Sequence, residues 1–205
     1  MFLKKNCTIF WLTILLLGLS LLGVGCRALG ATYEYKGTRL DPPLPLPDFK
    51  LTATTGQPFH LSQVKGDIAL IYFGYTFCPD VCPLTLADVK KALQNLEGRD
   101  RVQVIFISVD PERDTPEVLQ RYMNAFDPTF IGLTDDFARI EEVMQAYGAF
   151  AEKEDAPDSA AGYLVSHTAR LYLVTPQSEL LLTYPFGFEP EDLHNDLTYL
   201  LQQES

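Results

Sequence analysis

Two cysteines lie four positions apart in the run Phe73-Gly-Tyr-Thr-Phe-Cys78-Pro-Asp-Val-Cys82-Pro. The run lies between an apolar stretch of strand length and a segment with helical spacing. Near a helix N-terminus the dipole and the unpaired backbone N–H groups favour a thiolate. A thiolate is both the nucleophile of disulfide exchange and a ligand for soft metal ions. The pair therefore predicts a redox-active disulfide or a metal chelate.

A structural disulfide is the plainer alternative for two neighbouring cysteines. A bridge between Cys78 and Cys82 would close a very short loop. Such a bridge removes little chain entropy from the unfolded state and so stabilises a fold only weakly. The spacing also differs from the Cys-x-x-Cys of ordinary thioredoxin-like reductases. These cysteines are better placed for reactivity than for holding the chain together.

His167 differs from the other two histidines in its context, because it directly precedes a predicted strand at residues 169–174. In the thioredoxin fold the loop at this place lies beside the cysteine turn and normally carries a cis-proline, which is replaced here by histidine. One imidazole and two thiolates suit Cu(I) and accept Cu(II), whereas zinc usually takes a fourth ligand. His60 and His194 are expected to be ordinary surface or core residues.

The order of predicted elements positions these side chains. Residues 68–73 are a continuous apolar run, which is typical of a parallel strand buried on both faces, and residues 102–109 are predicted to form a second buried strand. The pattern along the chain predicts an α/β, thioredoxin-like fold in which a mixed central sheet has helices on both faces. The remaining expected elements are a hairpin around Gly56, helices at 85–96, from Pro116, at about 135–147 and from Pro190, and strands at 130–133, 169–174 and 180–184.

Asp110 ends the second buried strand, on the same sheet edge as the cysteines. It is interpreted either as a second-shell carboxylate that tunes the thiolates or orients His167, or as a cap for the turn into Pro111. Arg113 and Asp114 are expected to hold their own loop. Residues 148–166 show little periodicity and are predicted to form a mobile loop beside the metal, with a disordered surface insertion as the alternative.

Three motifs together carry a specific resemblance. They are Gly74-Tyr-Thr-Phe-Cys-Pro-Asp-Val-Cys-Pro, then Ser108-Val-Asp-Pro-Glu-Arg-Asp-Thr-Pro, then His167-Thr. In this order and spacing the chain resembles the Sco/SenC family of copper chaperones over roughly residues 47–201. The resemblance implies that Cys78, Cys82 and His167 bind copper. It also implies a role in assembling the dinuclear copper centre of cytochrome c oxidase.

Two functions fit the cysteines. The first is a metallochaperone that delivers copper to the copper-site subunit of the oxidase, with another copper chaperone or a thiol reductase as a further partner. The second is a thiol:disulfide oxidoreductase that keeps the cysteines of that subunit reduced. Only the first needs His167. A peroxiredoxin-like peroxidase fits the fold, but the Thr-x-x-Cys context is absent, because Thr76 stands at the wrong spacing from Cys78.

The N-terminus predicts the location of the domain. Lys4 and Lys5 precede residues 6–26, which carry no charged side chain and are rich in Leu and Ile. This segment predicts a membrane anchor, with the rest of the chain facing the periplasm or cell exterior. Small residues before Cys26 resemble a lipoprotein processing site, so a lipidated Cys26 and an uncleaved span remain alternatives. Cys7 lies inside the apolar segment and is given no chemical role.

Composition and charge complete the expected organisation. Prolines between residues 27 and 47 predict an extended linker, with packing of part of it along the domain edge as the alternative, and residues 48–205 are expected to form a single domain. A content of 47% hydrophobic and 21% charged residues is typical of folded globular proteins. The formal net charge of -11 argues against a nucleic-acid surface or a basic patch for anionic lipid.

Overall fold

A mixed sheet is the centre of the fold in the computed structural model, which describes residues 33–64, 68–157 and 161–203. The three central strands β4, β5 and β6 are parallel, and the other neighbours pair antiparallel. Within the described residues the strand order across the sheet is β1 (Thr38–Pro45), β10 (Glu179–Pro185), β9 (Arg170–Val174), β4 (Ile68–Gly74), β5 (Val102–Ser108), β6 (Ile131–Thr134), β2 (Lys50–Ala53) and β3 (Pro58–His60).

The two most buried strands are β4 and β5. Every residue of β4 is buried, and in β5 only Gln103 is partly exposed. Their predominantly apolar sequences suit parallel strands because helices cover both faces of this part of the sheet. Aromatic side chains extend the core on each face: Tyr72 lies against Phe106 on one side, and Phe73 lies against Tyr147 on the other. The two predicted central strands are confirmed.

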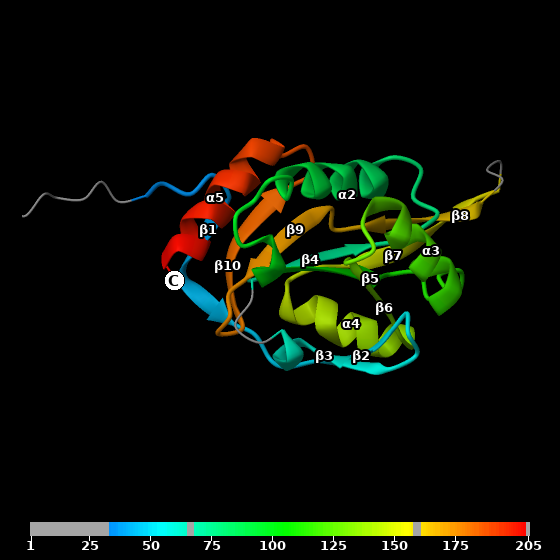
Figure 1. Ribbon diagram of the computed structural model, residues 1–205. Helices are drawn as coiled ribbons and strands as arrows, with labels where there is room; N and C mark the ends of the chain where they lie inside the picture. The colour runs from blue at the N-terminus through cyan, green and yellow to red at the C-terminus, as the bar shows by residue number, and fades with distance from the viewer. Residues whose placement is uncertain (1–32, 65–67, 158–160, 204–205) are drawn as a thin grey trace, which may run out of the picture. The chain divides into compact units, whose positions relative to one another are not determined.

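Helices lie on both faces of the sheet, as predicted. In Figure 1, α2 and α5 run side by side above the sheet, and α4 lies below it. The helices are α2 (Val81–Ala92), α3 (Pro116–Phe126), α4 (Phe137–Ala146) and α5 (Pro190–Gln203), and short 3-10 turns occur at Leu61–Gln63 and Arg99–Arg101. The α/β, thioredoxin-like architecture predicted from the sequence is therefore the observed one.

Two helices differ in how closely their first residues match the local sequence signals. Thr115 caps α3, because its Oγ1 accepts a hydrogen bond from Val118 N at 3.4 Å and Pro116 occupies the first turn. In contrast, α2 begins at Val81, one turn before the predicted start at Thr85. Pro83 fits this first turn because its missing N–H would have no partner there. The earlier start places Cys82 inside the helix.

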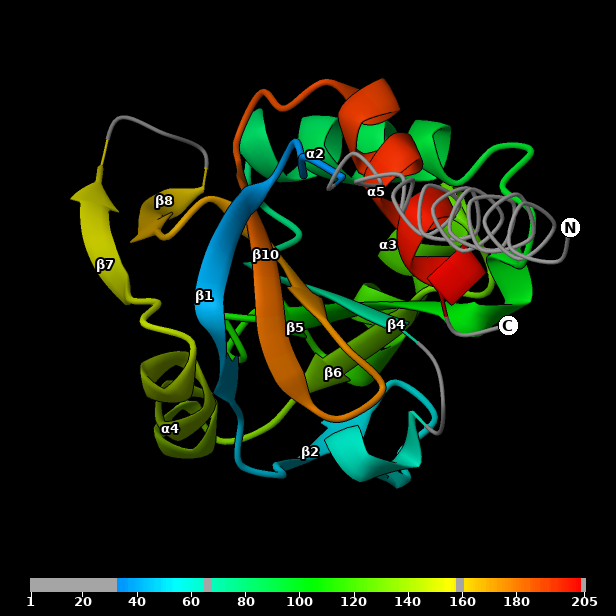
Figure 2. The same cartoon turned by 90° about the vertical axis from the view of Figure 1, so that its left-hand side faces the viewer.

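The proline-rich segment is partly a strand. Residues 38–45 form β1, which pairs with β10 at the edge of the sheet, as Figure 2 shows. The register shifts between Arg39 and Leu44, and Leu46 N donates to the carbonyl oxygen of Ser178 at 2.9 Å. An edge strand tolerates proline because one side of it needs no backbone N–H. Part of the linker expected at residues 27–47 therefore belongs to the domain.

A second sheet occurs where a loop was expected at residues 148–166. Strands β7 (Ala151–Ala156) and β8 (Gly162–His167) pair antiparallel, with Ala151 opposite His167. The hairpin stands apart from β1 and β10 in Figure 2. The loop prediction was wrong because periodicity reports a buried face, and β7 has no buried residue. In β8 only Val165 is buried.

The expected membrane anchor at residues 6–26, with Cys7 and Cys26, lies outside the described residues. Among the residues that are described, none of the helices has the length and apolar character needed to cross a bilayer.

Candidate metal centre

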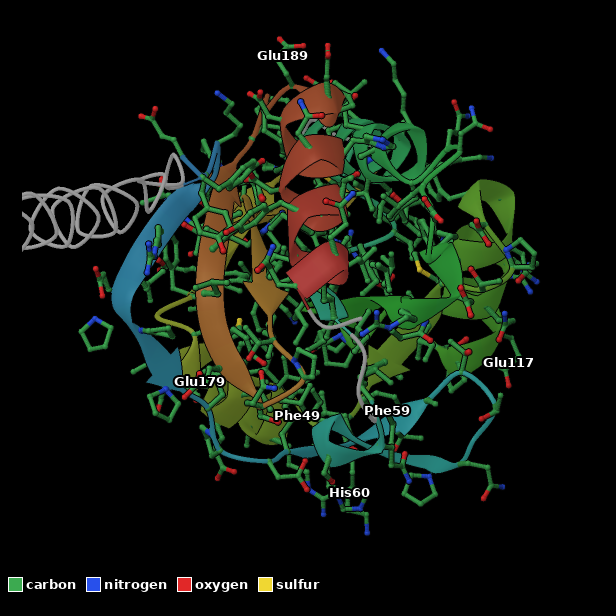
Figure 3. All side chains as sticks on the ribbon, turned by 60° about the vertical axis from the view of Figure 1, so that its left-hand side comes forward. Phe49, Phe59, His60, Glu117, Glu179 and Glu189 are labelled. Atoms are coloured by element: carbon green, nitrogen blue, oxygen red, sulfur yellow. The ribbon has the colours of Figure 1, made fainter. Side chains whose placement is uncertain are left out.

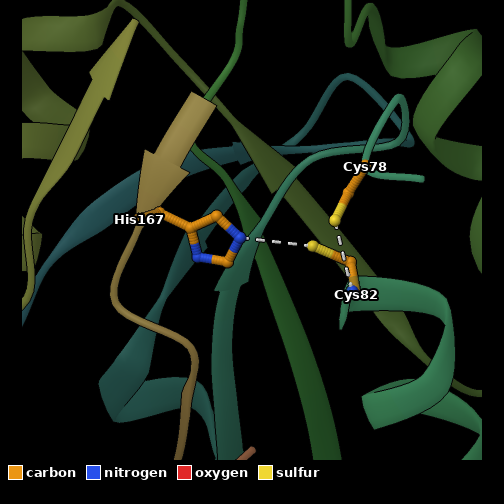
Figure 4. A group of neighbouring side chains, drawn as sticks. All are labelled: Cys78, Cys82 and His167. Carbon is orange, nitrogen blue, oxygen red and sulfur yellow. Dashed lines mark hydrogen bonds between the residues drawn. The ribbon is translucent and has the colours of Figure 1, made fainter. Parts of the chain in front are cut away.

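Three side chains that are distant in the sequence meet at one end of the central sheet. Cys78 lies in the turn after β4, Cys82 in the first turn of α2, and His167 at the end of β8 (Figure 4). Their ligand atoms all lie within 4.8 Å of one another. The structure thus brings together the three residues that the sequence predicted as ligands.

The first turn of α2 shapes the cysteine pair. Cys82 is buried and Cys78 is half-buried, and neither forms a disulfide. The backbone N–H of Cys82 donates to Cys78 Sγ at 3.4 Å, as expected for an anionic group at a helix N-terminus. The turn itself is closed by a hydrogen bond from Cys78 N to the carbonyl oxygen of Tyr75 at 3.3 Å.

The two sulfur atoms differ in their acidity. The pKa of Cys78 falls from 9.0 to about 4, chiefly because the Cys82 thiol donates to its sulfur, with further hydrogen bonds from His167 and the backbone. The pKa of Cys82 is raised, because its proton serves the neighbouring thiolate and because the side chain is buried. In the metal-free pair, Cys78 is the thiolate and Cys82 the thiol.

The imidazole of His167 approaches the sulfur atoms through Nε2. Nε2 lies 3.4 Å from Cys82 Sγ, and Nδ1 lies 3.2 Å from the carbonyl oxygen of Thr168. A carbonyl oxygen only accepts, so Nδ1 carries a ring proton, and Nε2 is the nitrogen that faces the sulfur atoms. The rings of Tyr72 and Tyr75 meet the imidazole edge to face, at centroid distances of 6.2 and 5.8 Å.

The other two histidines are bonded elsewhere, in keeping with their predicted ordinary roles. His60 projects from the surface beside β3 in Figure 3, and its Nδ1 lies 3.3 Å from an oxygen of Asp48. His194 Nδ1 lies 2.7 Å from the carbonyl oxygen of Ala92, which joins α5 to α2. Within the described part of the chain, the group of potential ligands is Cys78, Cys82 and His167.

The donor set fits copper. Two sulfur atoms and one imidazole nitrogen are soft and borderline ligands, which match Cu(I) and also accept Cu(II). The Nδ1 hydrogen bond fixes His167 in the tautomer that a metal requires at Nε2. A cleft of about 290 Å³ opens at the site and is lined by Cys78 and His167 together with Asp80 and Glu154. The group is therefore reachable from outside.

Two residues of β4 support Cys82 and were missed by the sequence analysis. The Tyr72 hydroxyl donates to Cys82 Sγ at 3.8 Å within the buried core. A Cβ atom at Gly74 would lie 3.0 Å from the same sulfur and 2.9 Å from the Phe106 ring. Glycine is therefore required at this position. The signal available in the sequence was that both residues lie among the last three residues of the strand that leads into the cysteines.

Asp114 has a wider role than the expected one of holding its own loop. Its buried carboxylate accepts from the backbone N of Thr76 at 3.1 Å, from the Thr76 hydroxyl at 2.5 Å and from the Ser108 hydroxyl at 2.6 Å. Burial raises the pKa of this carboxyl, against these hydrogen bonds, which favour the charged form. Asp114 thus ties two segments together: the turn that contains Cys78, and the end of β5.

Asp110 lies at the predicted place but binds other partners. Its carboxylate accepts from Arg113 Nε and, at 2.7 Å, from the Tyr163 hydroxyl. Among the described contacts it has no hydrogen bond with Cys78, Cys82 or His167. Its main-chain oxygen accepts from the N atoms of Arg113 and Asp114 at 3.1 and 3.0 Å, which matches the turn alternative.

Comparison with known proteins agrees with this geometry. The family model described as SCO1/SenC matches residues 39–202. The SCO2-like protein of Rickettsia felis is 32% identical over 148 residues, which cover 71% of this chain and 72% of that protein. The copper-bound structure of Bradyrhizobium japonicum ScoI is 37% identical, with a TM-score of 0.68, over 76% of this chain and 99% of that one.

A solution structure of apo Sco1 from Thermus thermophilus is 41% identical and superposes with a TM-score of 0.70. The superposed region covers 85% of this chain and 99% of the Thermus thermophilus chain. The matched region contains the whole described sheet from Arg39 onward and all three residues of the site. The chain belongs to the SCO1/SenC family.

Proposed function

We propose that this protein is a copper metallochaperone that holds one copper ion through Cys78, Cys82 and His167. The observation that carries the proposal is the convergence of the three ligand atoms within 4.8 Å, beside a cleft that Cys78 and His167 line. The copper bound in the structure of Bradyrhizobium japonicum ScoI supports it.

The site is suited to a transferable ion. Three protein ligands satisfy Cu(I) without enclosing it, so a fourth ligand from a partner can approach through the cleft. Cys78 and His167 line the cleft and are the ligands open to exchange, and His167 lies on the β7–β8 hairpin, outside the central sheet. Cys82 has no exposed surface and is the most enclosed of the three.

Family membership supplies the cellular setting. The Sco family is linked to the assembly of cytochrome c oxidase. We infer that the copper ion is destined for the copper-site subunit of that enzyme, with another copper chaperone or a thiol reductase as a further partner. We also infer that residues 1–26 anchor the domain to a membrane, with the domain on the periplasmic or exterior side.

A second function is favoured by one specific observation. The Cys78 pKa of about 4 makes this sulfur a thiolate at neutral pH, directly beside a second cysteine. A thiolate and a neighbouring thiol are what a thiol:disulfide oxidoreductase needs. The Cys78 thiolate would attack a partner disulfide, which forms a mixed disulfide and releases one partner sulfur as a thiol. Cys82 would then attack the Cys78 sulfur, which forms the Cys78–Cys82 disulfide and releases the second partner sulfur as a thiol.

Copper content and thiol chemistry separate the two functions. The reduced protein is expected to bind one copper per chain, and Cys78→Ala and Cys82→Ala each to bind none after challenge with a chelator. His167→Ala is expected to bind Cu(II) much more weakly while its dithiol reacts at nearly the wild-type rate, because the helix N-terminus and the sulfur pair set the thiolate. His194→Ala serves as the control, since His194 caps Ala92 away from the site.

Oxidase assembly in cells then decides between them. If His167→Ala binds no measurable copper and also fails to support assembly, copper delivery is the essential act. Full assembly by a variant that binds no copper would replace the chaperone function with the reductase function. Wild-type copper content in either cysteine variant would place the metal elsewhere.

A further inference from the structure

The hairpin that carries His167 needs support from the rest of the molecule. An isolated two-stranded hairpin is marginally stable at best in water. In β7 and β8 only Val165 is buried, and β7 carries four exposed residues in sequence, Glu152 to Asp155. The hairpin therefore has very little core of its own. The position of His167 depends on contacts that the hairpin makes with other elements.

Arg113 makes the largest set of these contacts. Its Nη1 donates to two carbonyl oxygens of the hairpin, those of Ala161 and Tyr163, each at 3.1 Å. Its Nε donates to the buried carboxylate of Asp110, which also accepts from the Tyr163 hydroxyl at 2.7 Å. The planar fork of a guanidinium can hold several acceptors at once, whereas a lysine ammonium cannot reproduce this geometry.

The same guanidinium also reaches the cysteine side of the site. Its carbon atom lies 3.6 Å from the centroid of the Tyr163 ring on the hairpin and 4.8 Å from that of Phe77, the residue before Cys78. The Tyr75 ring lies 5.8 Å away, and the Tyr75 hydroxyl accepts from Val165 N at 3.3 Å. Cation–π contacts of this kind are worth most when they are shielded from water, and the Arg113 side chain is only 15% exposed.

We propose that Arg113 is a positioning residue for His167, which it holds against the cysteine turn by joining β8 to Phe77 and Asp110. Arg113 touches none of the three ligands and acts through the hairpin backbone and the Tyr163 ring. Loss of this junction lets the hairpin open while the sulfur pair, which belongs to β4 and α2, stays in place. The identity of the metal in this inference rests on the proposed function, but the junction itself does not.

Hydrogen exchange of the metal-free protein tests the junction directly. In Arg113→Lys, which keeps the charge beside Asp110, and in Tyr163→Leu, the amides of residues 162–167 are expected to exchange about tenfold faster than in the wild type. The amides of β4 are expected to be unchanged. Two variants are used so that poor folding of one leaves the other informative, and thermal unfolding monitors folding in both.

Arg99→Lys is the matched control. Arg99 also binds a backbone carbonyl, that of Val102 at 2.7 Å, and a side chain of a neighbouring loop, Thr129 at 2.9 Å. It joins elements of the sheet that do not carry a ligand. Exchange at residues 162–167 is expected to be the same as in the wild type in this variant.

The Cu(II)-loaded protein supplies the second readout. Arg113→Lys and Tyr163→Leu are both expected to lose electron paramagnetic resonance coupling to the imidazole nitrogen and to release Cu(II) to a chelator about tenfold faster. They are expected to retain Cu(I) through the sulfur pair. Wild-type exchange and a wild-type Cu(II) spectrum in both variants would overturn the inference. If the wild type bound no copper but the exchange result held, the proposed function would fail and the junction would stand.

Discussion

The cysteine turn and the β7–β8 hairpin contribute to the same site from supports of unequal strength. The turn follows β4, a strand with every residue buried, and is tied to β5 by the carboxylate of Asp114. The hairpin has one buried residue, Val165, and is attached through side chains such as Arg113 and Tyr75. The sulfur atoms are therefore fixed by the core, and the imidazole by contacts that can be broken separately.

The sulfur ligands and the nitrogen ligand of the copper ion therefore differ in how firmly the protein holds them. The soft sulfur atoms, which dominate affinity for Cu(I), share the stability of the whole domain. The nitrogen ligand, which matters more for Cu(II), shares only the stability of the hairpin and its attachments. Changes in the core should therefore affect both oxidation states of the metal, and changes in the hairpin chiefly one.

The largest effect is expected from a change that breaks the cysteine side. Gly74→Val places carbon atoms against Cys82 Sγ, Phe106 and Tyr72, where even a Cβ would lie 2.9 to 3.0 Å away. Overpacking of this kind is expected to lower the free energy of unfolding by about 3 kcal/mol and to abolish copper binding. Urea unfolding and copper content measure the two effects.

A glycine of the hairpin provides the control for that change. Gly162 has a φ of +72° and nothing within 4 Å of an added Cβ. Gly162→Ala is expected to cost about 1 kcal/mol, from backbone strain alone, and to leave Cu(I) content unchanged. An equal loss of Cu(I) in both glycine variants would contradict the idea that the Cu(I) ligands depend on the core and not on the hairpin.

A smaller effect is expected at the carboxylate that holds the turn. The Asp114 carboxylate accepts from three donors, two of them on Thr76. Asp114→Asn keeps the shape of the side chain but replaces one accepting oxygen with an NH₂ group, so at least one donor loses its acceptor. An unsatisfied buried donor costs about 2 kcal/mol, so the free energy of unfolding should fall by that amount. Thermal unfolding measures it.

The matched variant is Asp127→Asn. Asp127 accepts from Thr129 N at 2.8 Å and from the Thr129 hydroxyl at 2.7 Å, and it pairs with Arg99 at 3.7 Å, all in an exposed loop. A clearly smaller loss of stability is expected there. A similar loss in both variants would mean that burial of the Asp114 network contributes nothing.

The hydroxyl of Tyr72 is a further contact on the cysteine side of the site. Tyr72→Phe keeps the ring beside His167 and removes only the donor to Cys82 Sγ. The loss is expected to be about 1 kcal/mol of stability, together with a red shift of the sulfur-to-Cu(II) charge-transfer band, because a hydrogen bond lowers the energy of the sulfur electrons. Tyr122→Phe is the control, since the buried Tyr122 hydroxyl has no hydrogen-bond partner within the described residues. A band shift in the control alone would reject this role.

The smallest effect concerns acidity and leaves stability aside. Alkylation of Cys78 in the metal-free protein is expected to be nearly constant from about pH 6 to about pH 9. It should decline as the pH falls through about 4, where the thiolate takes up its proton. Alkylation followed by mass spectrometry gives the profile.

Two variants compare the two supports in the same assay. The hydrogen bond from Cys82 is the main cause of the low Cys78 pKa, and the one from His167 contributes less. Removing a donor raises the pKa, so Cys82→Ala should move the decline to higher pH by more than His167→Ala does. The reverse order would show that the hairpin, and not the turn, controls the thiolate.

Much of the fold and of the site could be predicted from local signals. The strand at 68–74 begins with a continuous apolar run, the strand at 102–108 is mostly apolar, and the cysteine pair lies directly between a strand and a helix. The order of elements then places the loop before β9 beside that turn, which is why His167 could be assigned. These inferences need only the pattern of burial and the connection rules of α/β sheets.

The remainder depends on long-range contacts between polar side chains. Nothing local in β7 predicts a strand, because its residues face water and follow no period. Arg113 bonds to residues about fifty positions away, and Asp114 to a residue 38 positions away. A sequence places such residues in a loop but does not name their partners, so it left Asp110 open between a second-shell carboxylate and a cap for its own turn.

The two edges of the central sheet bear on how the domain behaves at high local concentration. One edge is β1, with Pro42, Pro43 and Pro45 in its sequence, and the other is β3, which has three residues. Proline cannot donate to an added strand, and a three-residue edge offers few bonds. Crowded copies of the domain should therefore resist pairing edge to edge, a route by which exposed strands nucleate aggregates.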